Sequence, residues 1–244
     1  MTVDLDSMLM RMRLRLVMAI STHPSLYYGL RKMTGTMDHL CINEDTEIVI
    51  EGYPRSANST TAYGFLARQT RPVRLAHHKH HAAQLLLAAK QGIPSVMLIR
   101  QPEQAVISNL ALMLESQKRN TKGKKGTITF EDALRAWLVF YRAVEPCNHA
   151  FVIAPFEEVT QDIGGMIRSI NRKFGTNFSD EAPPQGRVEP LGWHATPNEI
   201  RNAIKNQLSK NFAQALAHST HLRTMLIEAN SLYQRFIKLS EAHH

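Results

Sequence analysis

The sequence predicts an α/β fold of three layers, in which a mostly parallel sheet carries helices on both faces. Short apolar runs alternate along the chain with longer segments whose apolar residues recur at helical spacing. Residues 95–99 form a continuous apolar run, as expected of a strand that is buried on both faces. The chain has 244 residues, of which 43% are hydrophobic, enough for a single core. We therefore expect one domain over residues 1–244.

Residues 1–40 are expected to form a helical extension, with helix over residues 7–33 that is interrupted near Pro24. Met and Leu alternate there with three arginines, Arg11, Arg13 and Arg15. These charges interrupt the apolar run and no small-residue cleavage site follows, so we do not expect a signal peptide. An amphipathic helix that packs on the body is the favoured interpretation, and peripheral contact with a membrane surface is the alternative.

The remaining elements are predicted to alternate. Strands are expected over residues 48–50, 73–77, 95–99 and 151–154. Helices are expected over residues 62–69, 82–90, 103–117, 129–144 and from about 160 to 174. Thr129 and Asp132 resemble a capping pair at the start of one of these helices. Two further helices, over residues 197–217 and 219–240, are expected to form a helical C-terminus that begins at residue 196.

Composition limits the partners. A net charge of +8 and a pI near 9.7 indicate an anionic partner such as a nucleotide, another phosphorylated or sulfated ligand, or a membrane surface. Nucleic acid is not expected, since aromatic residues make up only 7% of the chain and no nucleic-acid motif is recognised. Two cysteines, Cys41 and Cys147, imply no disulfide framework, so a reducing, cytoplasmic location is expected. The oligomeric state is left open.

Residues 47–61 combine the features of an anion site. A short apolar strand runs into a turn, then into Arg55, then into a helical segment. Five small residues follow the arginine, namely Ser56, Ala57, Asn58, Ser59 and Thr60. The first N–H groups of a helix have no intrahelical partner and lie at the positive end of its dipole, and Arg55 adds a permanent charge. An ordinary turn with a Ser or Asn helix cap is the alternative interpretation.

Two further strand ends carry polar side chains. In parallel sheets ligands bind beyond the carboxyl ends of the strands. His77 and His78 end one predicted strand, and Arg100 ends the next. Because Pro102 favours a helix start, Arg100 and Ser108 are placed to hold one anion between the strand end and the second helical turn. Taken alone, an arginine at a strand end is more often a salt-bridge or surface residue than part of an anion site.

These stretches resemble the sulfotransferase family, which takes sulfate from 3′-phosphoadenosine 5′-phosphosulfate (PAPS). Residues 53–59, Tyr-Pro-Arg-Ser-Ala-Asn-Ser, look like the family's loop for the 5′-phosphosulfate, with Ala57 in place of glycine. Arg100 and Ser108 match its 3′-phosphate motif in spacing, with glutamine in place of the usual aspartate after the arginine. Residues 156–159 are similar to its Tyr-Glu-Asp-Leu strand end. Over residues 47–175, the resemblance implies a P-loop-NTPase-like sulfotransferase architecture.

The resemblance implies transfer of a sulfuryl group from PAPS to an acceptor hydroxyl or amine, leaving adenosine 3′,5′-bisphosphate (PAP). The residues that it assigns to the nucleotide are Arg55, Ser56, Ala57, Asn58, Ser59, Thr60, Arg100, Ser108 and Arg187. Arg55 would also be catalytic, because it stabilises the leaving phosphate. Two departures stand out. Ala57 requires a backbone conformation that a Cβ tolerates, and Thr60 cannot stack on adenine as the aromatic residue of cytosolic members does.

Four histidines, His77, His78, His80 and His81, flank Lys79 where the family places its catalytic base. An imidazole titrates near neutrality and is able to take a proton from an attacking hydroxyl. The resemblance implies His78 as the base, with His80 second. A metal site formed by His77 and His81 on one helix face is a rival interpretation, as are histidines without a role. We expect no metal, because no carboxylate or cysteine lies close by in sequence.

Two other functions remain open. A P-loop nucleotide kinase or phosphotransferase is disfavoured by the missing Gly-Lys pair of the nucleotide loop. A non-catalytic anion-binding or nucleic-acid-binding protein is suggested by net charge alone. Three lysines, Lys122, Lys124 and Lys125, belong either to a solvated charge run or to a lid over the acceptor. No motif identifies the acceptor.

Overall fold

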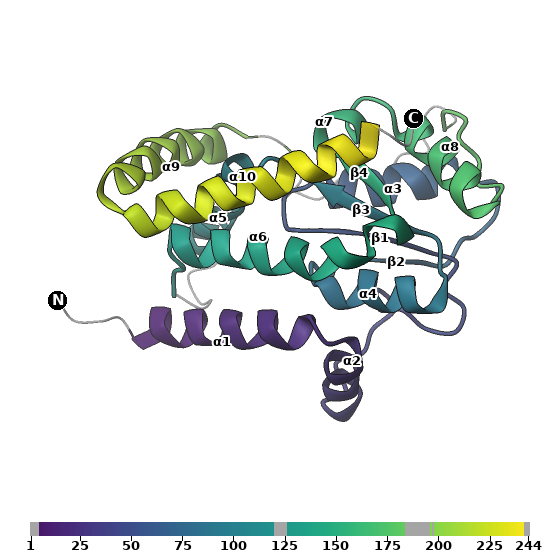
Figure 1. Cartoon of the computed structure of the whole chain (residues 1–244), viewed down its shortest axis with the longest axis horizontal. Helices are drawn as coiled ribbons and strands as arrows, with labels where there is room; N and C mark the ends of the chain where they lie inside the picture. Colours follow the sequence, from purple (N-terminus) through teal and green to yellow (C-terminus); the bar gives the residue numbers. More distant parts are fainter. Residues whose placement is uncertain (1–4, 120–125, 184–195, 197, 242–244) are drawn as a thin grey trace.

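A computed structural model of the chain describes residues 5–119, 126–183, 196 and 198–241. Its centre is a parallel sheet with helices on both faces (Figure 1). The strands of this sheet, in chain order, are β1 (Ile48–Gly52), β2 (Leu75–His77), β3 (Ser95–Ile99) and β4 (Val152–Pro155). They lie side by side in the order β2-β1-β3-β4, and every pair is parallel. The prediction of an α/β fold with a parallel sheet is confirmed.

The helices before β4 are α1 (Leu5–Ser21), α2 (Pro24–Met33), α3 (Asn58–Arg68), α4 (Ala82–Gln91), α5 (Pro102–Arg119), α6 (Phe130–Val144) and the 3₁₀-helix η1 (Glu145–Ala150). Those after it are α7 (Phe156–Val159), α8 (Ile163–Phe174), α9 (Glu199–His218) and α10 (Thr220–Glu241). The capping pair predicted from sequence is confirmed, since Thr129 and Asp132 form a reciprocal capping box at the start of α6. In the described ranges, no helix is sufficiently long and apolar to traverse a lipid bilayer.

Alternate residues of each strand enter two separate cores. Val49, Met97 and Ile153 join the core beneath α4, α5, α6 and α10. Their neighbours Ile48 and Val96 face the opposite way, into a core that α3 and α8 cover. Because both faces of β3 are buried, its sequence shows no alternation of polar and apolar residues.

Several boundaries differ from the sequence prediction, and three of these differences lie in β1, β2 and α3. β1 runs on to Gly52 instead of ending at residue 50, because its last two residues pair with β3. β2 is limited to residues 75–77, which are the residues that pair with Ile48, Val49 and Ile50 of β1. α3 begins at Asn58, four residues before the predicted start, and this places the small polar residues in its first turn.

Candidate functional site

The turn from β1 to α3 has an unusual backbone. Ala57, the N-cap residue of α3, lies in the left-handed region with φ of 71°, and no side chain caps the helix. The alternative of an ordinary Ser or Asn cap is therefore wrong. The first N–H groups of α3, from Asn58 to Thr60, lack an intrahelical acceptor for geometric reasons and lie at the positive end of the helix dipole. Such a turn suits an oxyanion.

Two tyrosines hold this turn in place. The buried Tyr53 hydroxyl donates to the carbonyl of Ala133 at 3.1 Å, and Asn58 Nδ2 donates to the Tyr53 carbonyl at 3.0 Å. Tyr141 from α6 donates to the carbonyl of Leu98 at 2.8 Å, and its oxygen accepts the Tyr53 N–H at 3.4 Å. The turn is thereby tied to α6 and to β3. Tyr53 accordingly has a structural role.

The two motifs at neighbouring strand ends meet directly. Arg55 Nε donates to Ser108 Oγ at 3.1 Å, and Arg100 Nη1 donates to the carbonyl of Arg55 at 3.1 Å. This meeting follows from the strand order, since β1 and β3 are adjacent and parallel. The structure thus brings Arg55, Arg100 and Ser108 to one place.

Arg100 is held by an aromatic ring. Its guanidinium carbon lies 3.8 Å from the centroid of Phe156, the first residue of α7. Arg100 Nε is buried and has no hydrogen-bond partner in the described part of the chain. Burial lowers the pKa of Arg100, while Glu157 acts in the opposite direction. An unsatisfied donor on a half-buried cation is the feature that an anionic ligand would satisfy.

Helix α9 adds two cations that the sequence analysis missed, Arg201 and Lys205. Burial, followed by repulsion from Arg201 and Arg100, lowers the pKa of Arg55 to about 10. Burial also lowers the pKa of Lys205, with repulsion from Arg55, Arg100 and Arg201 as the next causes. We call Arg55, Arg100, Arg201 and Lys205 the basic cluster. For Arg201 and Lys205, the signal available in the sequence was their spacing of four residues within a predicted helix.

One buried carboxylate lies beside the basic cluster. Glu115 on α5 accepts from Arg201 Nε at 2.5 Å and also binds Arg119 and Asn198. Burial alone would raise the pKa of Glu115, but its bonds to Arg201 and Arg119 hold it below the usual value. The Glu115 carboxylate therefore offsets part of the repulsion among the cations of the basic cluster. Its contacts with Asn198 and Arg201 also fix the start of α9.

The histidine segment lies against the first turn of α3. His78 Nε2 is 2.8 Å from Ser59 Oγ, and His78 Nδ1 faces Nδ1 of His77 at the end of β2. His80 turns the other way, with Nδ1 3.1 Å from the carbonyl oxygen of Gly52. Both candidate bases therefore border the β1–α3 turn.

Glu51 anchors this segment and was also missed. Its carboxylate, fully buried within β1, accepts the Lys79 N–H at 2.8 Å and Gln84 Nε2 at 3.0 Å. His80 Nδ1 lies 3.7 Å from the other carboxylate oxygen. The available signal was a glutamate within an otherwise apolar strand, where an unpaired charge would be costly.

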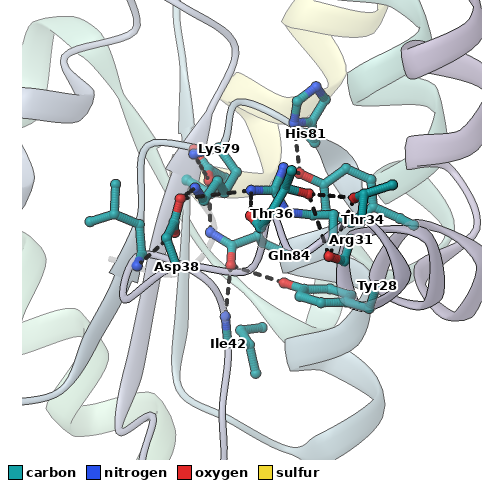
Figure 2. A network of polar contacts seen from close by, with 12 residues as sticks. Tyr28, Arg31, Thr34, Thr36, Asp38, Ile42, Lys79, His81 and Gln84 are labelled. Carbon is teal, nitrogen blue, oxygen red and sulfur yellow. Dashed lines mark hydrogen bonds and ion pairs between the residues drawn. The ribbon is translucent and has the colours of Figure 1, made fainter.

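An outer layer of polar contacts ties the segment to the N-terminal helices (Figure 2). Gln84 Oε1 accepts the Tyr28 hydroxyl at 2.9 Å and the N–H of Ile42 at 3.0 Å. The ammonium group of Lys79 pairs with Asp38. The segment is thus fixed by contacts from α2, from α4 and from the loop between α2 and β1.

His77 and His81 do not form the metal site considered from sequence. His77 belongs to β2 and His81 precedes α4, so the two do not share a helix face as that interpretation required. His81 Nδ1 lies 3.1 Å from the Tyr27 hydroxyl. Burial first, and then neighbouring imidazoles or cations, lowers the pKa of both histidines to about 4. Among the described residues, no three His, Cys, Asp or Glu side chains gather as metal ligands.

Backbone strain is concentrated at this site. In the described part of the chain, the non-glycine residues with positive φ are Arg55, Ala57, His78 and His80. Each such residue costs about 1–3 kcal/mol, and residues of this kind cluster at functional sites. All four lie in or beside the β1–α3 turn.

Other features lie apart from the basic cluster or outside the described residues. An apolar cavity of about 310 Å³ between α5, residues 127–130 and α9 has no charged side chain in its lining, so it does not suit an anion. Arg187 and the three lysines of the 122–125 stretch lie outside the described residues.

Comparisons with known proteins add little. No family model matches the chain, and no curated protein matches it. Among solved structures, the chain is similar to mouse sulfotransferase SULT7A1 in a crystal structure with PAP, with 12% identity and a TM-score of 0.42. The match covers 79% of this chain and 91% of that chain. A likeness at this level assigns neither an activity nor a residue role.

Proposed function

We propose that the chain is a sulfotransferase that uses PAPS as donor and a hydroxyl or amine as acceptor. The observation that carries the proposal is the contact between two anion-binding motifs, through Arg55 with Ser108 and Arg100 with the Arg55 carbonyl. A nucleotide with phosphate groups at both its 3′ and 5′ positions is the ligand class for which two adjoining oxyanion pockets are suited. The bound donor would supply the sulfuryl group.

The residues present fit such a donor. Arg55 and the first turn of α3 would hold the 5′-phosphosulfate, and Arg100 with Ser108 would hold the 3′-phosphate. Arg201 and Lys205 would strengthen the positive potential over both pockets. A ligand with several negative charges would relieve the repulsion that lowers the pKa of Arg55 and Lys205. It would also offer an acceptor to the unpartnered Arg100 Nε.

Arg55 would also stabilise charge on the departing phosphate. Its pKa of about 10 keeps the guanidinium charged at neutral pH, so Arg55 would act by electrostatics instead of by proton transfer.

His80 has better support as the general base than His78. Its Nδ1 is engaged by the Gly52 carbonyl and lies near the Glu51 carboxylate, an arrangement that would orient the ring. Nε2 of His80 would then be the atom that takes the acceptor proton. His78, in contrast, has Nδ1 against His77 and Nε2 against Ser59. We therefore assign Glu51 to positioning His80 and His78 to the wall of the site.

Ligand-induced stabilisation tests the donor assignment. PAP at about 100 times its dissociation constant is expected to stabilise the protein by about 2.7 kcal/mol, and ATP with magnesium or AMP is expected to do much less. Arg100→Ala should remove the PAP effect, whereas Arg235→Ala, which removes an exposed arginine paired with Glu145 on the body, should keep it. Equal stabilisation by ATP and PAP would favour a nucleotide kinase.

Transfer assays test the base. Release of PAP from PAPS is measured with a panel of phenols, alcohols and amines, for the wild type, His80→Asn, His78→Asn and Glu51→Gln. His80→Asn should lower turnover by about 10²–10⁴-fold and His78→Asn by much less. Glu51→Gln should lower turnover in the wild-type background but cause no further loss when added to His80→Asn, a result that a purely structural role would not produce. The reverse order of the two histidine variants would assign the base to His78.

A further inference from the structure

The exposed apolar side chains gather on the two N-terminal helices. Among the described residues, ten large hydrophobic side chains are exposed, and eight of them belong to α1 or α2. Five lie on α1, namely Leu5, Met8, Leu9, Met12 and Leu16, and we call this set the outer stripe. Three lie on α2, namely Leu26, Leu30 and Met33. Single exposed apolar residues are ordinary, but a cluster of this kind marks an interaction surface.

The outer stripe faces away from the body. Its members recur at helical spacing, so they share one face of α1. The opposite face contacts the body, where Ser7 and Met18 are buried and Ser7 Oγ accepts the Thr127 N–H at 2.9 Å. On the outer side, Met12 is 59% exposed and Leu16 is 61% exposed. An amphipathic surface helix normally turns its apolar face inward, and α1 instead exposes an apolar face.

Cations border the outer stripe. At about 100° per residue, Arg13 and Arg15 fall on opposite sides of it. Residues 5–33 contain four arginines and one lysine, and Asp6 is their single acidic residue. On the body beneath α1, Asp132 pairs with both Arg11 and Arg15, so one carboxylate faces two guanidinium groups. The edge formed by α1 and α2, which lie together at the bottom of Figure 1, is therefore strongly basic as well as apolar.

We propose that α1 docks this protein onto an anionic bilayer surface, with the outer stripe among the lipid headgroups and acyl chain ends and its arginines against acidic headgroups. Apolar residues flanked by arginines are the pattern of a helix that lies in the membrane interface. Charge complementarity favours this occupant over a second copy of the chain. Two outer stripes placed face to face would bring the arginines of both copies together, and each copy would offset them only in part, through Asp6 on α1 and the one Asp132 carboxylate that Arg11 and Arg15 share.

Vesicle co-sedimentation of the full chain tests whether α1 binds an anionic bilayer. Binding is expected to vesicles of phosphatidylcholine with about 30% phosphatidylserine, to fall at high salt, and to be weak for phosphatidylcholine alone. The double variant Leu9→Glu with Leu16→Glu should lose more than about tenfold in affinity for the mixed vesicles. Ile227→Glu is the matched control, because Ile227 is exposed on α10, away from α1, and its replacement should leave binding unchanged.

Three outcomes would overturn the proposal. These are undiminished binding by the double variant, equal binding to neutral and anionic vesicles, and a lipid-free dimer that the double variant abolishes. Because all three positions are exposed, the variants should unfold at the wild-type temperature, and this is checked by circular dichroism. The test does not depend on the PAPS assignment, since it measures lipid binding alone.

Discussion

Arg55 and Ser108, which are 53 residues apart in the chain, share a hydrogen bond of 3.1 Å between Nε and Oγ. The bond crosses from the turn after β1 to the second turn of α5. It joins the proposed 5′-phosphosulfate pocket to the proposed 3′-phosphate pocket, so a ligand bound at one pocket would change the electrostatics of the other. Several expected outcomes follow from this contact and from the strained residues around it.

Replacing Ser108 should weaken nucleotide binding without affecting the fold. Ser108→Ala removes one donor and the partner of Arg55, and hydrogen bonds to charged groups contribute about 1.5–3 kcal/mol. We expect the dissociation constant of PAP, measured by calorimetry, to rise by at least about tenfold. Ser231→Ala is a matched control, because Ser231 Oγ accepts from Arg235 on α10 in a similar serine–arginine contact. Equal affinity of the two variants for PAP would contradict a role of Ser108 in binding the nucleotide.

Ala57→Gly should stabilise the protein. A left-handed φ of 71° is costly for alanine and free of strain for glycine, so the gain in unfolding free energy should be about 1 kcal/mol. Ala213→Gly, at an exposed position in the interior of α9, should instead lose about 1 kcal/mol. Denaturant unfolding measures the free energy of unfolding of both variants and so shows whether each is stabilised or destabilised. A lower unfolding free energy in both would mean that the backbone of Ala57 is not strained.

Gly52→Ala should be strongly destabilising. A Cβ on Gly52 would lie 2.5 Å from the carbonyl oxygen of Leu98, so β1 and β3 would have to separate. We expect a loss of at least about 2 kcal/mol in denaturant unfolding. Gly29→Ala on α2, where nothing lies within 4 Å of the added carbon, should be neutral or slightly stabilising. Similar stability of both variants would contradict the close approach of Gly52 to the carbonyl of Leu98.

Acid should destabilise the fold through His77. The folded-state pKa is about 4, whereas an unfolded histidine titrates near 6.5. Between these pH values the unfolded chain binds more protons, so stability is complete above about pH 6.5 and falls as the pH drops towards 4. The contribution of His77 is about 3 kcal/mol. Urea unfolding at a series of pH values should show a shallower slope for His77→Asn than for a variant of the exposed His149.

Glu115→Gln should change stability and PAP affinity in opposite directions. Removing one partner of a buried ion pair costs about 3–5 kcal/mol, so the melting temperature should fall. The loss of a negative charge beside Arg201 should at the same time tighten PAP binding at low salt. Glu145→Gln, whose ion pair with Arg235 is exposed, should change stability by less than about 1 kcal/mol. Weaker PAP binding by Glu115→Gln would contradict a role for the basic cluster in the site.

Parts of the site that depend on neighbouring residues could be predicted from sequence. The β1 turn and the Arg100 to Ser108 spacing each lie within one strand–turn–helix unit, where local rules fix the geometry. The early start of α3 could not be predicted, because it depends on Ala57 adopting a strained conformation. Glu51 could not be assigned either, since Lys79 and Gln84, which make its buried charge tolerable, lie about thirty residues further along the chain.

Short-range periodicity and turn chemistry are written in the chain, and they account for the alternation of strands and helices, the parallel sheet and the polar residues at its strand ends. The position of Arg201 and Lys205 at that edge and the outward direction of the apolar stripe of α1 depend instead on long-range packing. Arg201 reaches Glu115 across 86 residues of chain, and no local pattern encodes a contact of that span. Such contacts form only when the whole chain packs, because a charged side chain is buried without a large cost only where a distant segment brings it a partner.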